Sequence, residues 1–145
     1  MKKILMLMCA GILILSLPGC SIGRNLGEAR ALGDEYFEAI MEKDFESAVG
    51  YYLPRFLEEI SKNEALKTLA GINTKLGYMV SYKFKELRAN GQFDSDGSST
   101  TYRLIYETVY SKGPAIEQLT IVKSEDGTKM EILSFNINSA YLLTY

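Results

Sequence analysis

Three tyrosines recur at equal spacing in the stretch TYRLIYETVYSKG, at positions 102, 106 and 110. Side chains alternate between the two faces of a β-strand, so Tyr102, Tyr106 and Tyr110 share one face if this stretch is a strand. Their phenols could line a ligand cavity, because each ring is apolar and each hydroxyl donates a hydrogen bond. A tyrosine can also bury its ring in a core and leave its hydroxyl at a wet edge, and we favour this second role.

The composition limits the chemistry that could act beside these phenols. No histidine occurs in the 145 residues, which excludes the commonest general base near neutral pH and every nucleophile that a histidine activates. A zinc site would have to use carboxylates alone, and these suit zinc poorly. Asp94 to Gly97 reads DSDG and is similar to the start of a calcium loop, but its glycine comes early and the last glutamate ligand is missing. We therefore expect no metal and no cofactor.

The chain opens with a segment that has the layout of an export signal. Two lysines precede an apolar run from Ile4 to Leu17, and the small residues Gly19 and Cys20 follow. The run holds 14 residues, whereas a helix that crosses the hydrocarbon of a membrane needs roughly 20. This length favours an export signal over a permanent membrane-spanning anchor.

The sequence LPGC, at positions 17–20, resembles the lipobox of bacterial lipoproteins, in which the signal is cut just before a cysteine that carries lipid. Leu17, Gly19 and Cys20 match, and Pro18 departs from the small or β-branched residue that is usual there. Cys20 would be the sole cysteine of the mature chain, and lipidation would remove an unpaired thiol from an oxidising compartment. The alternative is an ordinary secreted protein that is cut nearby and keeps Cys20 as a stray thiol.

The lipobox resemblance implies a location in the cell envelope. A diacylglyceryl thioether on Cys20, with an acylated amino group, would anchor the protein to a membrane and hold it outside the cytoplasm. In a cell with two membranes, Ser21 is not the aspartate that usually retains a lipoprotein at the inner membrane, so the outer membrane is open to it. Without residues 1–19 the net charge changes from −2 to −4, and we expect no nucleic-acid partner.

The mature chain divides into a short N-terminal segment and one domain. We expect a lipidated cysteine and tether at residues 20–27, followed by a single domain at residues 28–145. Between Glu28 and Lys43 apolar residues recur at spacings of three and four, which predicts an amphipathic helix. Asp44 has the side chain of an N-cap for a second, shorter helix, which Pro54 would close or kink.

A third helix begins where Ser61 and Glu64 match a capping box, and Gly77 would end it. The pattern leaves open whether Phe56, Leu57 and Ile60 belong to this helix or to a separate turn. After Gly77 the apolar period changes from about 3.6 to 2, which indicates strands. Four are expected, separated by the loop NGQFDSDGSS and by turns at KGP and EDG: Val80–Lys85, Tyr102–Ser111, Ile116–Lys123 and Met130–Ile137.

Helices followed by strands with short loops predict an α+β fold with a mainly antiparallel sheet. The tail SAYLLTY either extends the last strand or packs on the helices. The segments KDFESAVGYYLPRF, TYRLIYETVYSKG and DGTKMEILSFNI, in this order around a capped helix, resemble the NTF2-like (nuclear-transport-factor-2-like, or SnoaL-like) superfamily from about Ala29 to Ile137. The resemblance is one of general pattern. It implies a cystatin-like cone, in which a curved four-stranded sheet wraps the N-terminal helices.

Some enzymes of this superfamily place a carboxylate base and phenol donors inside the cone. None of the residues here falls on a catalytic motif of the superfamily, and the Asp-His pair of its dehydratase-like members is excluded because histidine is absent. We therefore assign no catalytic residue. By type, the chain offers one acid, Asp34, which at the flank of its helix should be solvated. It also offers candidate pocket-lining tyrosines, and these are Tyr36, Tyr52, Tyr82, Tyr102 and Tyr106.

The tyrosine face of the strand at 102–111 should point toward the helices, because the opposite face carries Arg103 and Glu107. Ile105 and Val109 lie among those charges, and with Ile116 and Val122 they predict an outer patch through which a homodimer could form.

Three functions stay open at this point. The first is a small binding or accessory module tethered in the envelope, with a small apolar ligand or an envelope protein as its partner. The second is a cofactor-free isomerase or dehydratase that uses a carboxylate and tyrosines, and the third is a structural interaction module whose cone is filled. A cavity between the tyrosine face and the helices, and a carboxylate that reaches it, would distinguish them.

Overall fold

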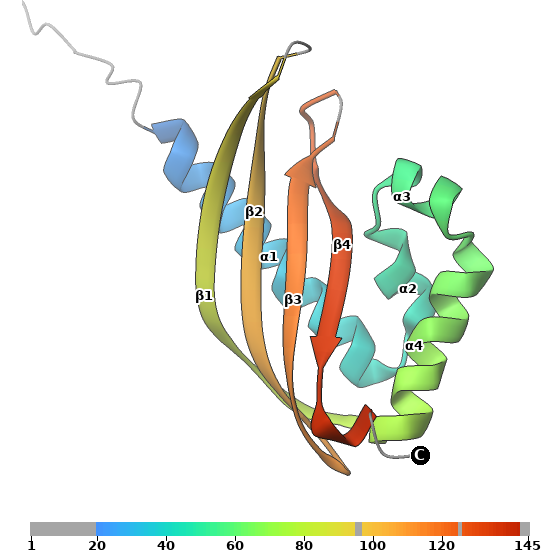
Figure 1. The fold of residues 1–145 in the computed structure, drawn as a ribbon. Coiled ribbons are helices and arrows are strands. Elements are labelled where there is room, and N and C mark those ends of the chain that lie inside the picture. Colours follow the sequence, from blue (N-terminus) through green and yellow to red (C-terminus); the bar gives the residue numbers. More distant parts are fainter. Residues whose placement is uncertain (1–19, 95–96, 125, 143–145) are drawn as a thin grey trace, which may run out of the picture.

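Four α-helices precede a four-stranded antiparallel sheet in the part of the chain that the computed structural model describes, which is residues 20–94, 97–124 and 126–142 (Figure 1). The predicted α+β fold is therefore confirmed. The predicted export signal at residues 1–19 and the side chain of Cys20 lie outside the described part. Among the described helices, none combines the length and the apolar character that crossing a membrane requires.

The first helix, α1 (Cys20–Glu42), is longer at its N-terminus than the pattern predicts. The segment expected as a tether, residues 20–27, is helical in the structure rather than extended. Two contacts explain the difference. Arg24 donates from Nε to Glu28 Oε1 at 2.8 Å, one turn along the helix, and Leu26 packs against the core. At 1.5 Å per residue, this segment adds about 12 Å of helix.

The second helix, α2 (Phe45–Gly50), starts as predicted at Asp44, whose Oδ1 accepts from Ser47 N at 3.0 Å. Pro54 does not close or kink this helix. It is the first residue of a separate helix, α3 (Pro54–Glu59), where a proline without an N–H removes no helical hydrogen bond. Phe56 and Leu57 thus belong to α3.

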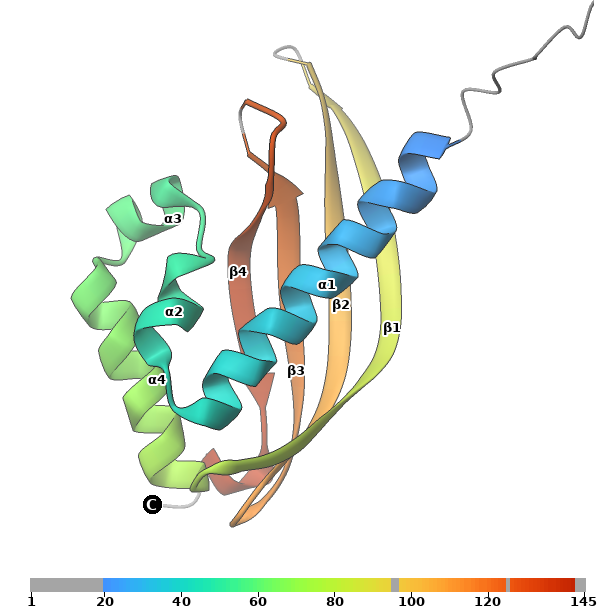
Figure 2. The same ribbon diagram turned by 180° about the vertical axis from the view of Figure 1, so that it is seen from behind.

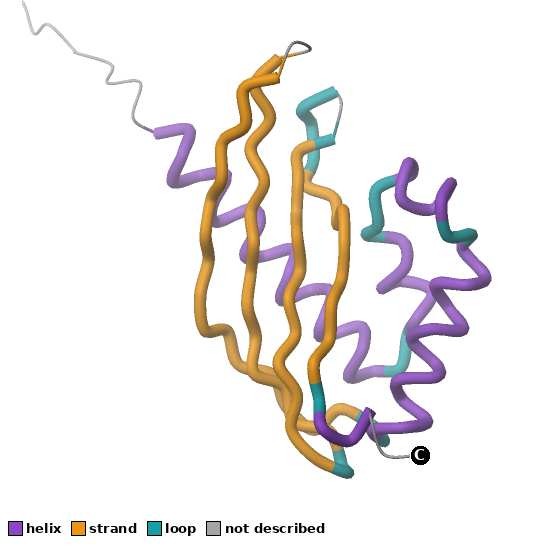
Figure 3. The backbone as a smooth tube through the Cα atoms, viewed as in Figure 1, coloured by secondary structure: helices purple, strands orange, loops and turns teal. Residues whose placement is uncertain are grey.

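The fourth helix, α4 (Lys62–Leu76), begins at the predicted cap, since Ser61 Oγ accepts from Glu64 N at 3.3 Å. It ends at Gly77, whose φ of 81° favours glycine. The turn after the second strand closes on this helix end, because Lys112 N donates to Leu76 O at 3.0 Å. The lower ends of the first two strands accordingly swing toward α4 (Figure 3).

The strands follow one another in space as they do in sequence: β1 (Met79–Asp94), β2 (Gly97–Tyr110), β3 (Gly113–Lys123) and β4 (Met130–Asn138). Most of the predicted loop NGQFDSDGSS is strand instead, because the pairing of β1 with β2 continues from Asn90 and Thr101 to Asp94 and Gly97. Paired backbone groups need no apolar side chains to continue a ladder, so the polar composition of this stretch does not prevent strand pairing. Two register shifts in β1, near Val80 and Lys85, curve this strand.

One face of the sheet is covered by α1, which crosses it diagonally from β1 toward β4 (Figure 2). The predicted inward face of β2 is confirmed: Tyr102, Leu104, Tyr106, Thr108 and Tyr110 are all buried. The exposed edge of β4 is partly closed by the segment before α3, since Leu53 N donates to Ile132 O and Ile132 N donates to Tyr51 O, both at 2.8 Å. The tail turns into a short 3-10 helix, η1 (Ala140–Leu142), which contacts α4 rather than extending β4.

The helix α1 approaches the sheet closely at Gly33. A Cβ placed there would lie 2.4 Å from the Tyr106 hydroxyl and 2.9 Å from Leu104 Cδ2. Gly71 in α4 is the opposite case, because a Cβ there meets nothing within 4 Å. The two helical glycines therefore differ in what an alanine would cost.

We expect Gly33→Ala to destabilise the fold by about 1 to 3 kcal/mol through overpacking. Gly71→Ala should stabilise it by about 0.5 to 1 kcal/mol, because alanine is the better helix former and meets open space. Urea unfolding followed by circular dichroism measures both. A stabilising Gly33→Ala would show that α1 does not approach β2 this closely.

Candidate functional site

The predicted site residues separate into two clusters in the folded chain. Tyr36 and Tyr52 are buried together, with hydroxyl oxygens 3.2 Å apart. Tyr82 and Tyr106 both pack against Phe37, with their own ring centroids 6.1 Å apart, and Asp34 accepts a hydrogen bond from each. The fifth tyrosine, Tyr102, is buried between Ala89 and Ile121 in the sheet.

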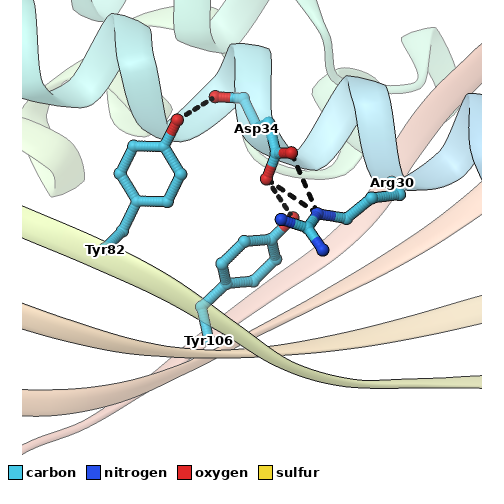
Figure 4. A network of polar contacts seen from close by, with 4 residues as sticks. All are labelled: Arg30, Asp34, Tyr82 and Tyr106. Carbon is cyan, nitrogen blue, oxygen red and sulfur yellow. Dashed lines mark hydrogen bonds and ion pairs between the residues drawn. The ribbon is translucent and has the colours of Figure 1, made fainter.

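Asp34 lies at the edge of the interior, where it accepts hydrogen bonds from other side chains as well as facing solvent (Figure 4). Its Oδ1 accepts from the Tyr106 hydroxyl at 3.0 Å, and both of its carboxylate oxygens accept from Arg30 Nε at 2.9 Å. The Tyr82 hydroxyl donates to its backbone oxygen at 3.3 Å. The side chain is still 36% exposed, which agrees in part with the predicted solvated aspartate. Arg30 in turn lies 3.8 Å above the Phe84 ring.

This network holds a helix on a sheet. Burial, then the charge of Asp34, raise the pKa of Tyr106, so its hydroxyl remains a donor at any physiological pH. The carboxylate already accepts from an arginine and a phenol, and both come from the chain itself. Asp34 thus connects α1 to both strands, because Tyr106 on β2 donates to its carboxylate and Tyr82 on β1 donates to its backbone oxygen.

A second carboxyl group, Glu117, lies deeper in the interior and was missed by the sequence analysis. It is 1% exposed, and its Oε1 accepts from Thr108 Oγ1 at 2.7 Å and from the Tyr110 hydroxyl at 2.8 Å. Among the described residues no lysine or arginine forms an ion pair with it. A signal for it existed in the strand pattern, because Glu117 shares the alternating face of β3 with Leu119 and Ile121.

Burial has the largest effect on the pKa of Glu117. The loss of hydration raises its pKa to about 7, against the opposing effect of the hydrogen bonds from Thr108 and Tyr110. Burial and the adjacent carboxyl also raise the pKa of Tyr110, which therefore stays a donor. A carboxyl group with this pKa can exchange a proton near neutral pH.

A cavity of about 10 Å³ adjoins Glu117 between the helices and the sheet. This volume holds a single water molecule at most. Of the tyrosines predicted to line a pocket, Tyr36 borders the cavity. The others lie elsewhere: Tyr52, Tyr102 and Tyr106 are buried in the core, and Tyr82 is partly buried against it. Aromatic packing fills the space instead: the Phe37 ring centroid, for example, is 4.4 Å from that of Tyr106. The lining residues are Tyr36, Ile40, Phe45, Leu69, Ile72, Asn73, Tyr110, Glu117 and Phe135.

A wider groove of about 490 Å³ lies on the outer side of the sheet, between the β2–β3 turn and the C-terminal turn η1. Val109 and Ile116 line it and are 43% and 48% exposed, so their predicted place on the outer face is confirmed. Ile105 and Val122 are only half-buried and lie farther along the strands. In the described residues, no three acidic or cysteine side chains come together as a metal site would require.

The pH dependence of stability should report Glu117. An unfolded chain releases this proton near pH 4.5 and the folded protein near pH 7, so the folded state binds more protons between these values. Its free energy of unfolding then falls by roughly 3 kcal/mol as the pH rises through that window. Because no histidine titrates there, Glu117→Gln should flatten the profile, as measured by urea unfolding from pH 4.5 to 8. An unchanged slope in the variant would assign the effect to another group.

Comparisons with known proteins support the fold and name no activity. No protein-family model matches the sequence, and the search of curated proteins gave no match. One solved structure that is similar, determined at 2.5 Å for a protein from Catenulispora acidiphila, aligns with a TM-score of 0.56 at 12% sequence identity. The alignment covers 81% of this chain and 93% of the other chain. At that identity the likeness extends to the α+β fold alone.

Proposed function

We propose that this protein is a lipid-anchored interaction module of the cell envelope, built on an NTF2-like cone, which binds a second copy of itself through its outer sheet face. The observation that carries the proposal is the filled interior. Pockets that take small molecules have volumes of roughly 300 to 1,000 Å³, whereas the cavity beside Glu117 measures about 10 Å³. A binding function therefore has to use the surface.

The arrangement of layers supports an NTF2-like cone. The curved sheet turns its tyrosine face to the N-terminal helices, α1 lies diagonally across that face, and the opposite face is left open (Figures 1 and 2). The order of the elements along the chain and the direction of the strands also fit the resemblance, since helices come first and an antiparallel meander follows them.

The LPGC sequence and the start of α1 support the lipid anchor. The helix begins at Cys20 and leads into the core without an intervening loop. The N-terminus of α1 lies near β1, whereas the β2–β3 turn and η1 lie at the other end of the domain (Figure 1). An anchor on Cys20 would leave the groove at Val109 and Ile116 accessible, away from the attachment point.

The outer groove has features that self-association requires. A twofold interface places the same patch on both sides, so its rim must not carry a single sign of charge. Here the apolar residues Val109 and Ile116 lie beside an ion pair, in which Lys85 Nζ is 3.0 Å from Glu107 Oε1. Exposed Val80 adds apolar surface on the neighbouring strand. An interface with an apolar centre and charges of both signs at its rim can pair with an identical copy, because each charge can lie opposite one of the other sign.

The pair Glu117 and Tyr110 favours a second candidate, a cofactor-free acid–base enzyme. A buried carboxyl with a pKa of about 7 beside a phenol donor has the properties of a general base. A reaction on a small molecule would require the cavity to grow from about 10 Å³ to roughly 300 Å³ or more. Native mass spectrometry of the purified chain separates the two candidates, because a co-purifying small molecule would favour the enzyme.

Changing Cys20 to Ser tests the anchor. We expect the wild-type chain to incorporate labelled fatty acid and to sediment with membranes, and Cys20→Ser to lose both properties, because serine cannot form the thioether. Cys9→Ser is the matched control and should behave as wild type, since Cys9 lies within the signal. Membrane retention by Cys20→Ser would refute lipid anchoring.

The dimer is tested by adding charge to the patch. We expect the wild type to be dimeric at about 10 to 100 µM in analytical ultracentrifugation. The double variant Val109→Glu, Ile116→Glu should be monomeric and should keep the circular dichroism spectrum of the wild type, because both positions are exposed in the single chain. The control pair Asn90→Glu, Asn136→Glu adds the same charge at exposed outer positions and should stay dimeric. A monomeric wild type over this range would contradict the proposal.

A further inference from the structure

Four polar side chains form one row across the outer face of the sheet, one from each strand. Arg88 pairs with Arg103, Arg103 with Thr120, and Thr120 with Ser134. Their chain neighbours Leu87, Leu104, Leu119 and Phe135 pack into the core, so the row itself points outward. The row lies away from the groove at Val109 and Ile116.

The register sets two arginines directly opposite each other. Side chains in such pairs have Cβ atoms about 4.5 to 5.5 Å apart, and like charges there destabilise the sheet. Arg88 is compensated, because its Nε and Nη2 donate to the two carboxylate oxygens of Glu86 at 2.6 and 3.1 Å. Arg103 forms no hydrogen bond or ion pair with any residue that the structure describes.

The neighbouring carboxylates already have partners. Glu107 pairs with Lys85 at 3.0 Å, and Glu131, which lies opposite Val122 one row along, pairs with Lys129 at 2.7 Å. The guanidinium of Arg103 is thus an exposed cation beside a second guanidinium. An anion from outside the described chain could therefore reduce the repulsion between Arg88 and Arg103.

The other two members of the row supply donors as well. The hydroxyls of Thr120 and Ser134 make no hydrogen bond within the described residues, and each can donate one. Arg103 presents five N–H donors in a planar fork, and Arg88 retains those that Glu86 does not use. A surface made of guanidinium and hydroxyl donors is suited to a tetrahedral oxyanion, because the fork matches two phosphate oxygens at once.

We propose that the row Arg88, Arg103, Thr120 and Ser134 binds a phosphate group, with Arg103 as the principal ligand. The phosphate can be inorganic or can belong to an anionic lipid headgroup. Arg88 lies on β1, the strand beside which α1 begins, so a headgroup near an anchored Cys20 has access to this edge of the sheet (Figures 1 and 2). The site itself depends on the register alone and not on the lipid anchor.

The test is thermal unfolding of the full chain, purified in a nonionic detergent at pH 7.5. Sodium phosphate is compared with sodium chloride at equal ionic strength. We expect phosphate to raise the unfolding midpoint of the wild type by about 2 to 4 °C more than chloride does. Arg103→Gln should lose this difference, and its midpoint in chloride should equal or exceed that of the wild type, because the like-charge pair is gone.

Two further variants separate the site from general salt effects. Arg55→Gln removes an exposed arginine on α3 and should respond to phosphate as the wild type does. Thr120→Val keeps the shape of the side chain without the hydroxyl and should reduce the response. An equal phosphate effect in wild type and Arg103→Gln would overturn the proposal.

A second arm distinguishes the sources of the phosphate group. The short-chain lipid dihexanoyl-phosphatidylglycerol replaces sodium phosphate, with dihexanoyl-phosphatidylcholine as the zwitterionic control. An Arg103-dependent shift with the anionic lipid alone assigns the site to headgroups, and a shift with inorganic phosphate assigns it to free anions. No Arg103-dependent shift in either arm would overturn the proposal, whether or not Cys20 carries lipid.

Discussion

The contact between α1 and β2 is the constraint on which the rest of the structure depends. Gly33 lets the helix approach until the Tyr106 hydroxyl and Leu104 leave no room for a Cβ, and Asp34 then accepts a hydrogen bond from that hydroxyl. Arg30 completes the contact through Asp34 and the Phe84 ring. A helix held this close brings the rings of Phe37 and Tyr36 into the space that a ligand would otherwise occupy.

The filled interior changes what the polar groups inside it can do. Tyr36 and Tyr52 satisfy each other, and Tyr110 and Thr108 both donate to Glu117, so the phenols act mainly as internal partners. Among the described residues no cation lies beside Glu117, and its burial raises the pKa of its carboxyl group.

The outer face of the sheet has a different character at its two ends. Near the β2–β3 turn it is apolar, with Val109 and Ile116 exposed, and farther along it carries the guanidinium and hydroxyl row that begins at Arg88. Both features arise from the same strands, because every inward tyrosine or leucine places its neighbour outward. The cavity beside Glu117 holds one water molecule at most, so the two surfaces on this face are better placed for recognition than the interior is.

The sequence by itself determined the local features of this protein. Asp44 and Ser61 predicted two helix starts, the change of period after Gly77 predicted the strands, and the charges of Arg103 and Glu107 predicted which way β2 faces. Each of these depends on residues close in the chain, where backbone capping and side-chain alternation act. Pro54 shows the limit of such reasoning: a proline fits a helix end and a helix start equally, and the packing around Leu53 and Ile132 selected the start.

Only the tertiary structure decided the properties of the candidate sites. The bond between Asp34 and Tyr106, the burial of Glu117 and the juxtaposition of Arg88 and Arg103 join residues from different elements. Strand register and the distance between helix and sheet set them, and no local pattern encodes either quantity. The volume of the interior is the difference between the space enclosed and the side chains that fill it, and both depend on how closely α1 approaches the sheet.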